Sequence, residues 1–171
     1  MTDTEYFGQN HNLRLIINDI MKCDDTYILH QCDCVSTEPI DLAGCLFCKY
    51  PFANTFKQRK NGTHDVPGTI HVAEGPQGKK IINMYAQYRP RVPVPNSIDD
   101  SKEKRLEYFW QCLTSVSTCV VSGETIAIPD HIGCKSSGGE WSSYLGMIND
   151  FASLVPSNKI TIYRRKMHLP Y

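Results

Sequence analysis

The stretch IPDHIGCKSSGGEW, residues 128–141, holds the residue types of this chain that are best suited to binding chemistry. An apolar run stops at Pro129, passes through small residues and two glycines, and re-enters a helical pattern at Trp141. Glycines let a backbone approach a ligand closely, and amide N–H groups just before a helix suit an anionic group. The segment therefore predicts a phosphate-binding turn at residues 135–139. The alternative is that the same residues only cap and turn the chain.

Acidic and imidazole side chains occupy further turns. Asp19 ends the run LIINDI, where a carboxylate can accept a hydrogen bond from an exocyclic amine or cap a local turn. Asp33 and Asp41 lie in ILHQCDCVSTEPIDLAGCLF, a second strand-to-helix turn, and Asp41 can also be the N-cap of the helix. Histidine is the side chain that most often exchanges protons in catalysis, so His131 is a candidate acid or base unless it is a strand-end histidine bonded to backbone. Asp33, Asp41 and His131 are the side chains of these turns that could accept a proton from a bound water.

The cysteines permit a competing interpretation. Cys32-x-Cys34 followed by Cys45-x-x-Cys48 is similar to the spacing of a four-thiolate zinc site. Free cysteine is also a common core residue, and we favour that reading. We therefore expect no metal and no cofactor. The N-terminal segment has no pattern of a secretory leader, so we expect reduced thiols in a soluble protein of the cytoplasm, the nucleus or both.

Length and composition limit the possible classes of protein. The chain has 171 residues, of which 41% are hydrophobic and 21% charged, which suits one domain over residues 1–171 with a core at about 13–165. Lys plus Arg and Asp plus Glu each total 18, so no net charge draws the protein to nucleic acid or to an anionic membrane. We expect a monomer with no nucleic-acid or membrane partner.

Strand and helix patterns alternate along the chain. Short runs rich in Ile, Val, Thr or Tyr predict strands at 13–18, 27–31, 69–73, 80–86, 125–129 and 159–163. Apolar spacing predicts helices that begin near Leu42, run over 106–116 and run over 141–155, with Trp110 and Trp141 in the core. Several strands are apolar at consecutive positions, so the prediction is a three-layer α/β/α fold with a mixed sheet. The proline-rich stretch 89–100 is expected to be a stiff surface connection.

The order of these pieces resembles the macrodomain family of ADP-ribose-binding modules. The likeness spans roughly residues 13–163 and rests on NDI, HQCDCVSTEPIDLA, PGTIHV, IINMYAQY, IPDHIGCKSSGGEW and ITIY. It is closest to the branch that holds ADP-ribose 1''-phosphate phosphatases and ADP-ribosyl hydrolases. The resemblance implies that ADP-ribose or an ADP-ribosylated substrate is the partner.

The resemblance also implies a role for each matching residue. Asp19 would hold the adenine amine beside Ile20, and Tyr163 or Arg164 would stack on the adenine. Asp33, Cys34 and the following loop to Asp41 would lie along the distal ribose. Gln87 and Tyr88 fall at a distal-ribose or catalytic position. Backbone N–H groups of Ser136, Ser137, Gly138 and Gly139 would wrap the diphosphate, and Cys134 and Lys135 of the same loop would also contact the ligand.

Two departures from the family pattern affect the expected activity. Asp33 stands where the family usually has Asn, and no glycine lies between Asp33 and Leu42. One ester-hydrolysing branch uses a Lys nucleophile and an Asp, but the matching positions here are Gln87 and Ser137, so we do not expect that covalent route. The prediction is ADP-ribose binding with hydrolysis of an ADP-ribose derivative at the distal ribose. The alternatives are a non-catalytic reader or an interaction module without the pocket.

Overall fold

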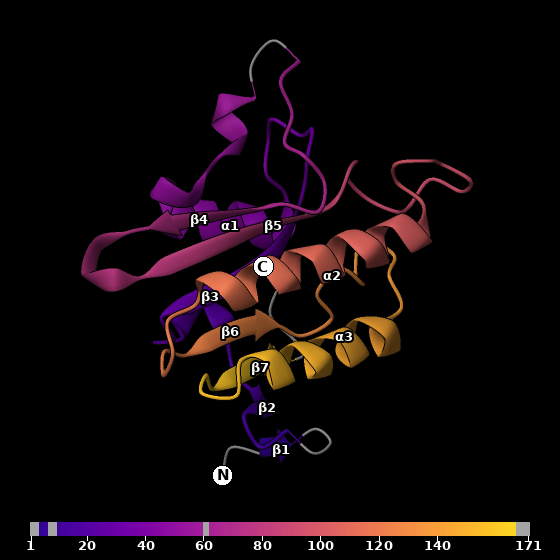
Figure 1. Cartoon of the computed structure of the whole chain (residues 1–171). Coiled ribbons are helices and arrows are strands. Elements are labelled where there is room, and N and C mark those ends of the chain that lie inside the picture. The colour runs from indigo at the N-terminus through magenta and orange to yellow at the C-terminus, as the bar shows by residue number, and fades with distance from the viewer. Residues whose placement is uncertain (1–3, 7–9, 60–61, 167–171) are drawn as a thin grey trace.

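A computed structural model describes residues 4–6, 10–59 and 62–166 of the chain. One mixed β-sheet forms the centre of this part of the protein. The sheet has seven strands in the order β1-β2-β7-β6-β3-β5-β4 (Figure 1). These strands are β1 (Thr4–Tyr6), β2 (Leu13–Ile17), β3 (Tyr27–Asp33), β4 (Ile70–Glu74), β5 (Lys80–Gln87), β6 (Ile126–Pro129) and β7 (Ile160–Arg164). The helices are α1 (Asp41–Lys49), α2 (Lys102–Cys119) and α3 (Trp141–Leu154), with short 3-10 turns at Ile20–Lys22, Pro51–Ala53, Phe56–Gln58 and Pro76–Gly78.

Helices cover both faces of the sheet, so the predicted three-layer α/β/α fold is confirmed. One face packs against α2 and α3, and the other packs against α1 and the turns that follow it (Figure 1). Alternate residues of β3 serve the two layers, because Tyr27 and Leu29 lie in the first core while Ile28 lies in the second. The apolar runs of the sequence follow from this double burial.

The sheet is parallel at its centre and antiparallel at its edges. Strands β2, β7, β6, β3 and β5 are parallel neighbours, whereas β1 and β4 pair antiparallel to β2 and β5. The carboxyl ends of the central strands therefore lie side by side and form the carboxyl edge of the sheet. In open α/β sheets, that edge is where ligands bind.

Two features of the sheet and helices differ from the expectation. Strand β1 was not predicted, because its three residues are too short to carry a periodic signal. The prediction that Trp110 lies in the core was wrong, because its side chain is 36% exposed. Trp110 directly follows the buried Phe109, which turns it about 100° around the helix and away from the sheet.

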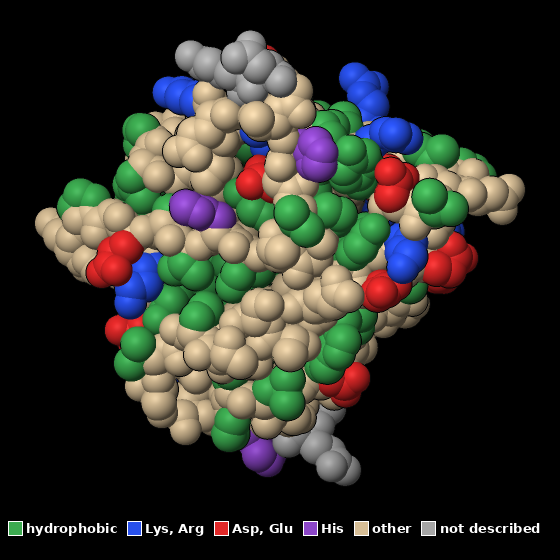
Figure 2. All heavy atoms as spheres, turned by 45° about the horizontal axis from the view of Figure 1, so that its top comes forward, with side chains coloured by type: hydrophobic (Ala, Val, Ile, Leu, Met, Phe, Trp, Pro, Cys, Tyr) green, Lys and Arg blue, Asp and Glu red, His purple; other side chains and the backbone are tan. Residues whose placement is uncertain are grey.

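Charged side chains do not gather into a patch of one sign on the face shown in Figure 2, where Lys and Arg lie interspersed with Asp and Glu. In the described ranges, no helix combines the length and the apolar character that a membrane span requires. The basic segment 163–168 begins in the last two residues of β7, and its residues 167 and 168 lie outside the described residues.

Candidate functional site

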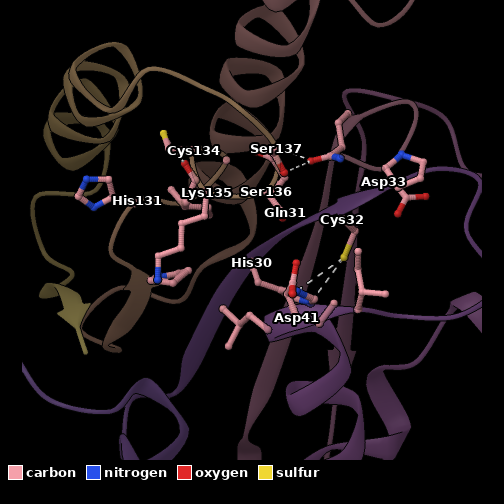
Figure 3. A pocket seen from close by; sticks show the side chains of 18 of the residues that line it. His30, Gln31, Cys32, Asp33, Asp41, His131, Cys134, Lys135, Ser136 and Ser137 are labelled. Carbon is pink, nitrogen blue, oxygen red and sulfur yellow. Dashed lines mark hydrogen bonds between the residues drawn. The ribbon is translucent and has the colours of Figure 1, made fainter. Parts of the chain in front are cut away.

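A cavity of about 300 Å³ opens at the carboxyl edge of the parallel strands. The ends of β3, β5 and β6 form its floor, the start of α1 forms one wall, and the loop between β6 and α3 forms the other (Figure 3). The side chains that line it include His30, Gln31, Cys32, Asp33, Ile40, Asp41, Gln87, Arg91, Asp130, His131, Cys134, Lys135, Ser136 and Ser137. The two strand-to-helix turns singled out in the sequence thus face the same space.

Backbone amides without an acceptor in the described part of the chain lie on two walls of the cavity. The N-cap of α1 is Ile40, whose side chain makes no cap hydrogen bond, and the amides of the first helical turn have no intrahelical acceptor. In the facing loop, the amides of Ser136 and Ser137 donate to no other described residue. Lys135 and Arg91 add positive charge to the lining. The cavity therefore suits a negatively charged group between the helix and the loop.

Glutamines hold this loop against the floor of the cavity. The Ser137 hydroxyl donates to Oε1 of Gln87 at 2.8 Å, and Nε2 of Gln31 donates to the same oxygen at 2.7 Å. The Gln87 amide donates in turn to the Arg89 carbonyl at 2.8 Å. Gln87 and Ser137 therefore bond to each other as neutral groups, and neither supplies a nucleophilic amine or a carboxylate.

The Asp33 carboxylate is engaged by its own loop. Its Oδ1 accepts from the amides of Val35 at 2.9 Å and Ser36 at 2.6 Å, and it lies 3.5 Å from the guanidinium of Arg59. Arg59 also donates to the Asp33 and Ser36 carbonyls, and pairs with Asp65 at 2.8 Å. An arginine clamp thus shapes the glycine-free loop and restricts Asp33 as a proton acceptor.

His131 lies on the opposite side of the cavity from Asp33 (Figure 3) and forms an oriented pair with Asp130, which also lines the cavity. The imidazole Nδ1 lies 2.9 Å from Oδ2 of Asp130, which also accepts from Nε of Arg164 at 2.9 Å. The ring stacks on Trp141 with 4.8 Å between centroids, and the backbone of His131 is left-handed at a φ of 58°. The histidine is therefore bonded to a carboxylate rather than to backbone, and a carboxylate at Nδ1 leaves Nε2 to exchange protons.

The thiols that line the cavity are not nucleophiles near neutral pH. Burial raises the pKa of Cys134 to about 12, with the Asp130 charge adding to the effect. Burial also raises the pKa of Cys32 well above its usual value. The thiolate is the reactive form of cysteine, so neither residue is an activated nucleophile.

The structure places the predicted site residues in two groups. Eight line the cavity: Asp33, Asp41, His131, Gln87, Cys134, Lys135, Ser136 and Ser137. The others do not: Asp19, Ile20, Cys34, Tyr88, Gly138, Gly139, Tyr163 and Arg164. Their contact with a ligand stays a prediction.

Local contacts account for several members of the second group. Asp19 accepts from the Met21 amide and caps a 3-10 turn, which is the capping alternative raised for it. Ile20, Cys34 and Tyr163 pack in the core beneath α1. Asp41, by contrast, is not the N-cap of α1 but its first residue, with a φ of 52°.

The zinc interpretation lacks a matching geometry. Among the described residues, no three His, Cys, Asp or Glu side chains come together as a metal site. Cys32 and Cys34 are buried, while Cys48 on α1 is exposed.

Sequence reasoning missed His30, Gln31, Arg59, Arg91 and Asp130. His30 and Gln31 precede Asp33 on the same strand, and period-two alternation identifies His30 as a partner of Cys32 on one face. Asp130 directly precedes His131, so an acidic neighbour was a readable signal. Arg59 comes from a distant turn, and no local pattern reveals its contact with Asp33.

Comparisons of the fold identify what the chain resembles. No family model and no curated protein sequence matches it. The macrodomain of DarG from Mycobacterium tuberculosis superposes with a TM-score of 0.67 at 17% identity, over 87% of this chain and 95% of that one. The DarG macrodomain of Thermus aquaticus gives 0.64 at 18% identity, over 89% and 97% of the two chains. The fold is that of a macrodomain.

A further neighbour carries a ligand. The Trypanosoma brucei macrodomain in complex with ADP-ribose gives a TM-score of 0.61 at 9% identity, over 90% of this chain and 63% of that one. At such low sequence identities, these superpositions show a shared fold and nothing more. The chemistry of this chain rests on its own residues.

Proposed function

We propose that the cavity binds ADP-ribose and that the protein recognises this group free or attached to another molecule. The observation that carries the proposal is the pair of facing anion-suited walls, namely the uncapped start of α1 and the amides of Ser136 and Ser137. A diphosphate fits between two such walls. The ADP-ribose bound to a macrodomain of the same fold supports this choice of nucleotide.

The lining favours recognition over covalent chemistry. Gln87 and Ser137 stand where the resemblance would require a lysine and an aspartate, and they are hydrogen-bonded to each other. Asp33 is held by Arg59 and two amides. A non-catalytic ADP-ribose reader needs only groups that bind the ligand, and the residues that line the cavity can supply them.

Calorimetric titration with ADP-ribose tests the binding. Lys135→Glu reverses a charge on the exposed loop, which should weaken binding about tenfold because a nearby like charge repels the diphosphate. Lys159→Glu makes the same change in charge just before β7, at the opposite edge of the sheet, and should bind as the native chain does. If the native protein gives no heat and no thermal shift with ADP-ribose, the proposal fails.

Hydrolysis at the distal ribose, for example of ADP-ribose 1''-phosphate, is a second candidate that the Asp130–His131 pair favours. Its imidazole lines the cavity and is oriented by a carboxylate at 2.9 Å, so Nε2 can accept a proton from water. Phosphate release from ADP-ribose 1''-phosphate would be measured for the native chain, His131→Gln and Asp33→Ala. This candidate is supported if the native chain releases phosphate and His131→Gln abolishes that release while still binding ADP-ribose. If the native chain releases no phosphate, the protein is a non-catalytic ADP-ribose reader.

A further inference from the structure

A buried ion pair lies beside the cavity, at the start of α2. Arg105 is 1% exposed, and its guanidinium grips the Asp100 carboxylate with Nε to Oδ1 at 3.0 Å and Nη2 to Oδ2 at 2.7 Å. Asp100 is fully buried, and its Oδ1 also accepts from the Tyr88 amide at 2.9 Å. The pair therefore joins α2 to the end of β5.

The remaining donors of the guanidinium reach two separate loops. They bond to backbone carbonyl oxygens: Nη1 to Arg91 at 2.6 Å and Ser137 at 3.2 Å, and Nη2 to Arg89 at 3.1 Å and Val92 at 3.3 Å. Every N–H of the guanidinium therefore faces an acceptor. One side chain from a rigid helix thus holds both the segment after β5 and the loop before α3.

Both loops supply residues that line the cavity. Arg91 lines it from one loop and Ser137 from the other, and Arg91 has a left-handed backbone with a φ of 68°. A non-glycine residue holds that conformation only where its surroundings impose it. The loops also touch, because a side chain added at Gly138 would meet Cγ1 of Val92 at 3.1 Å. Moving one loop therefore displaces the other.

We infer that Arg105 is a positioning residue for the binding site, which presents Arg91 and the Ser137 loop to the anionic part of the ligand. Arg105 does not line the cavity, and it reaches the two lining loops through their backbone carbonyls. The inference rests on the proposed function for the identity of the ligand. The contacts themselves do not depend on that ligand.

Lysine is the informative replacement at this position. It keeps the positive charge for Asp100, but its ammonium is a single point with three donors and cannot span two loops. Arg105→Lys should weaken ADP-ribose binding about tenfold and speed amide hydrogen exchange at residues 89–92 and 135–139 in the ligand-free protein. Asp100→Asn keeps an oxygen that can accept from the Tyr88 amide, and it should also weaken ADP-ribose binding and speed exchange in the two loops. It replaces Arg105→Lys as the test if that variant does not fold.

A matched control separates positioning from overall stability. Val116 is buried in the same helix but toward its far end, so Val116→Ala lowers the melting temperature without touching either loop. Calorimetry with ADP-ribose and hydrogen exchange would be run on all variants well below their melting temperatures. Val116→Ala should keep the native affinity and the native exchange of the two loops.

Each result decides the inference. Native affinity and native loop exchange in a folded Arg105→Lys protein would overturn it, as would an equal loss of affinity in Val116→Ala. If the native chain does not bind ADP-ribose, the proposed function fails on its own. The loop exchange of the ligand-free variants then still tests whether Arg105 positions the loops.

Discussion

His30, on the floor of the cavity, should make the stability of the protein depend on pH. Its ring is buried, and burial lowers the pKa of His30 to about 4. The Asn83 amide donates to the Ala53 carbonyl at 2.8 Å, so its Oδ1 faces the histidine and Nε2 of His30 donates to it at 2.6 Å. Phe47 packs against the ring edge-on, and Cys32 lies 3.7 Å away. Burial therefore holds the imidazole neutral, although the hydrogen bond to Asn83 acts in the opposite direction and raises its pKa.

The sign and size of the effect follow from linkage. Between pH 6.5 and about 4 the unfolded chain binds more protons than the folded protein, so stability is lost as the pH falls through this window. A tenfold difference in proton affinity is worth about 1.4 kcal/mol, so the total loss from His30 is roughly 3 kcal/mol. For a chain of this length, that corresponds to a melting temperature lower by roughly 6 to 12 °C.

Urea unfolding from about pH 7.5 to about pH 4.5 measures this loss. Carboxylates also titrate near the acid end, so the informative quantity is the difference between the native chain and His30→Gln. Glutamine keeps a donor for Asn83 but takes up no proton, so its stability should fall by about 2.5 kcal/mol less over that range. Parallel pH dependences of the two proteins would refute the reasoning.

Two further predictions concern the walls of the cavity. Arg59→Met should lower the free energy of unfolding by about 3 kcal/mol, because Asp33 then lies buried without its counter-charge. Adding Asp33→Asn should recover part of that loss in urea unfolding, whereas strictly additive effects would contradict the pairing. Gly139→Ala should cost roughly 2 kcal/mol, because the new Cβ would lie 2.4 Å from the Gly133 carbonyl oxygen. Gly146 lies on helix α3. Apart from its chain neighbours and the helix's own backbone, no described atom lies within 4 Å of a Cβ added there, so Gly146→Ala should instead stabilise the protein slightly. Equal melting temperatures of the Gly139→Ala and Gly146→Ala proteins would contradict this prediction.

Local patterns along the chain predicted the layers, and they singled out a loop of which residues 135–137 line the cavity. The apolar strands, the helical stripes and the Gly-Ser turn after β6 each have a short-range signal, because periodicity and turn chemistry depend on neighbouring residues. Those signals were enough to expect an α/β/α fold with a binding turn at residues 135–139. The sequence also carries a signal for Arg105, because this charged residue lies four positions before Phe109 on the buried face of α2.

The partners of the polar side chains were decided by the tertiary structure. Arg59 reaches Asp33 across 26 positions, and Arg105 reaches Ser137 across 32, so no spacing rule connects them. Asp33, a candidate base in the sequence, is the last residue of β3 and lies against Arg59, while His131 has a carboxylate partner. The residue types and the periodic pattern are properties of the chain alone. The charge that faces each group, and hence what the group can do, exists only once distant segments are packed together.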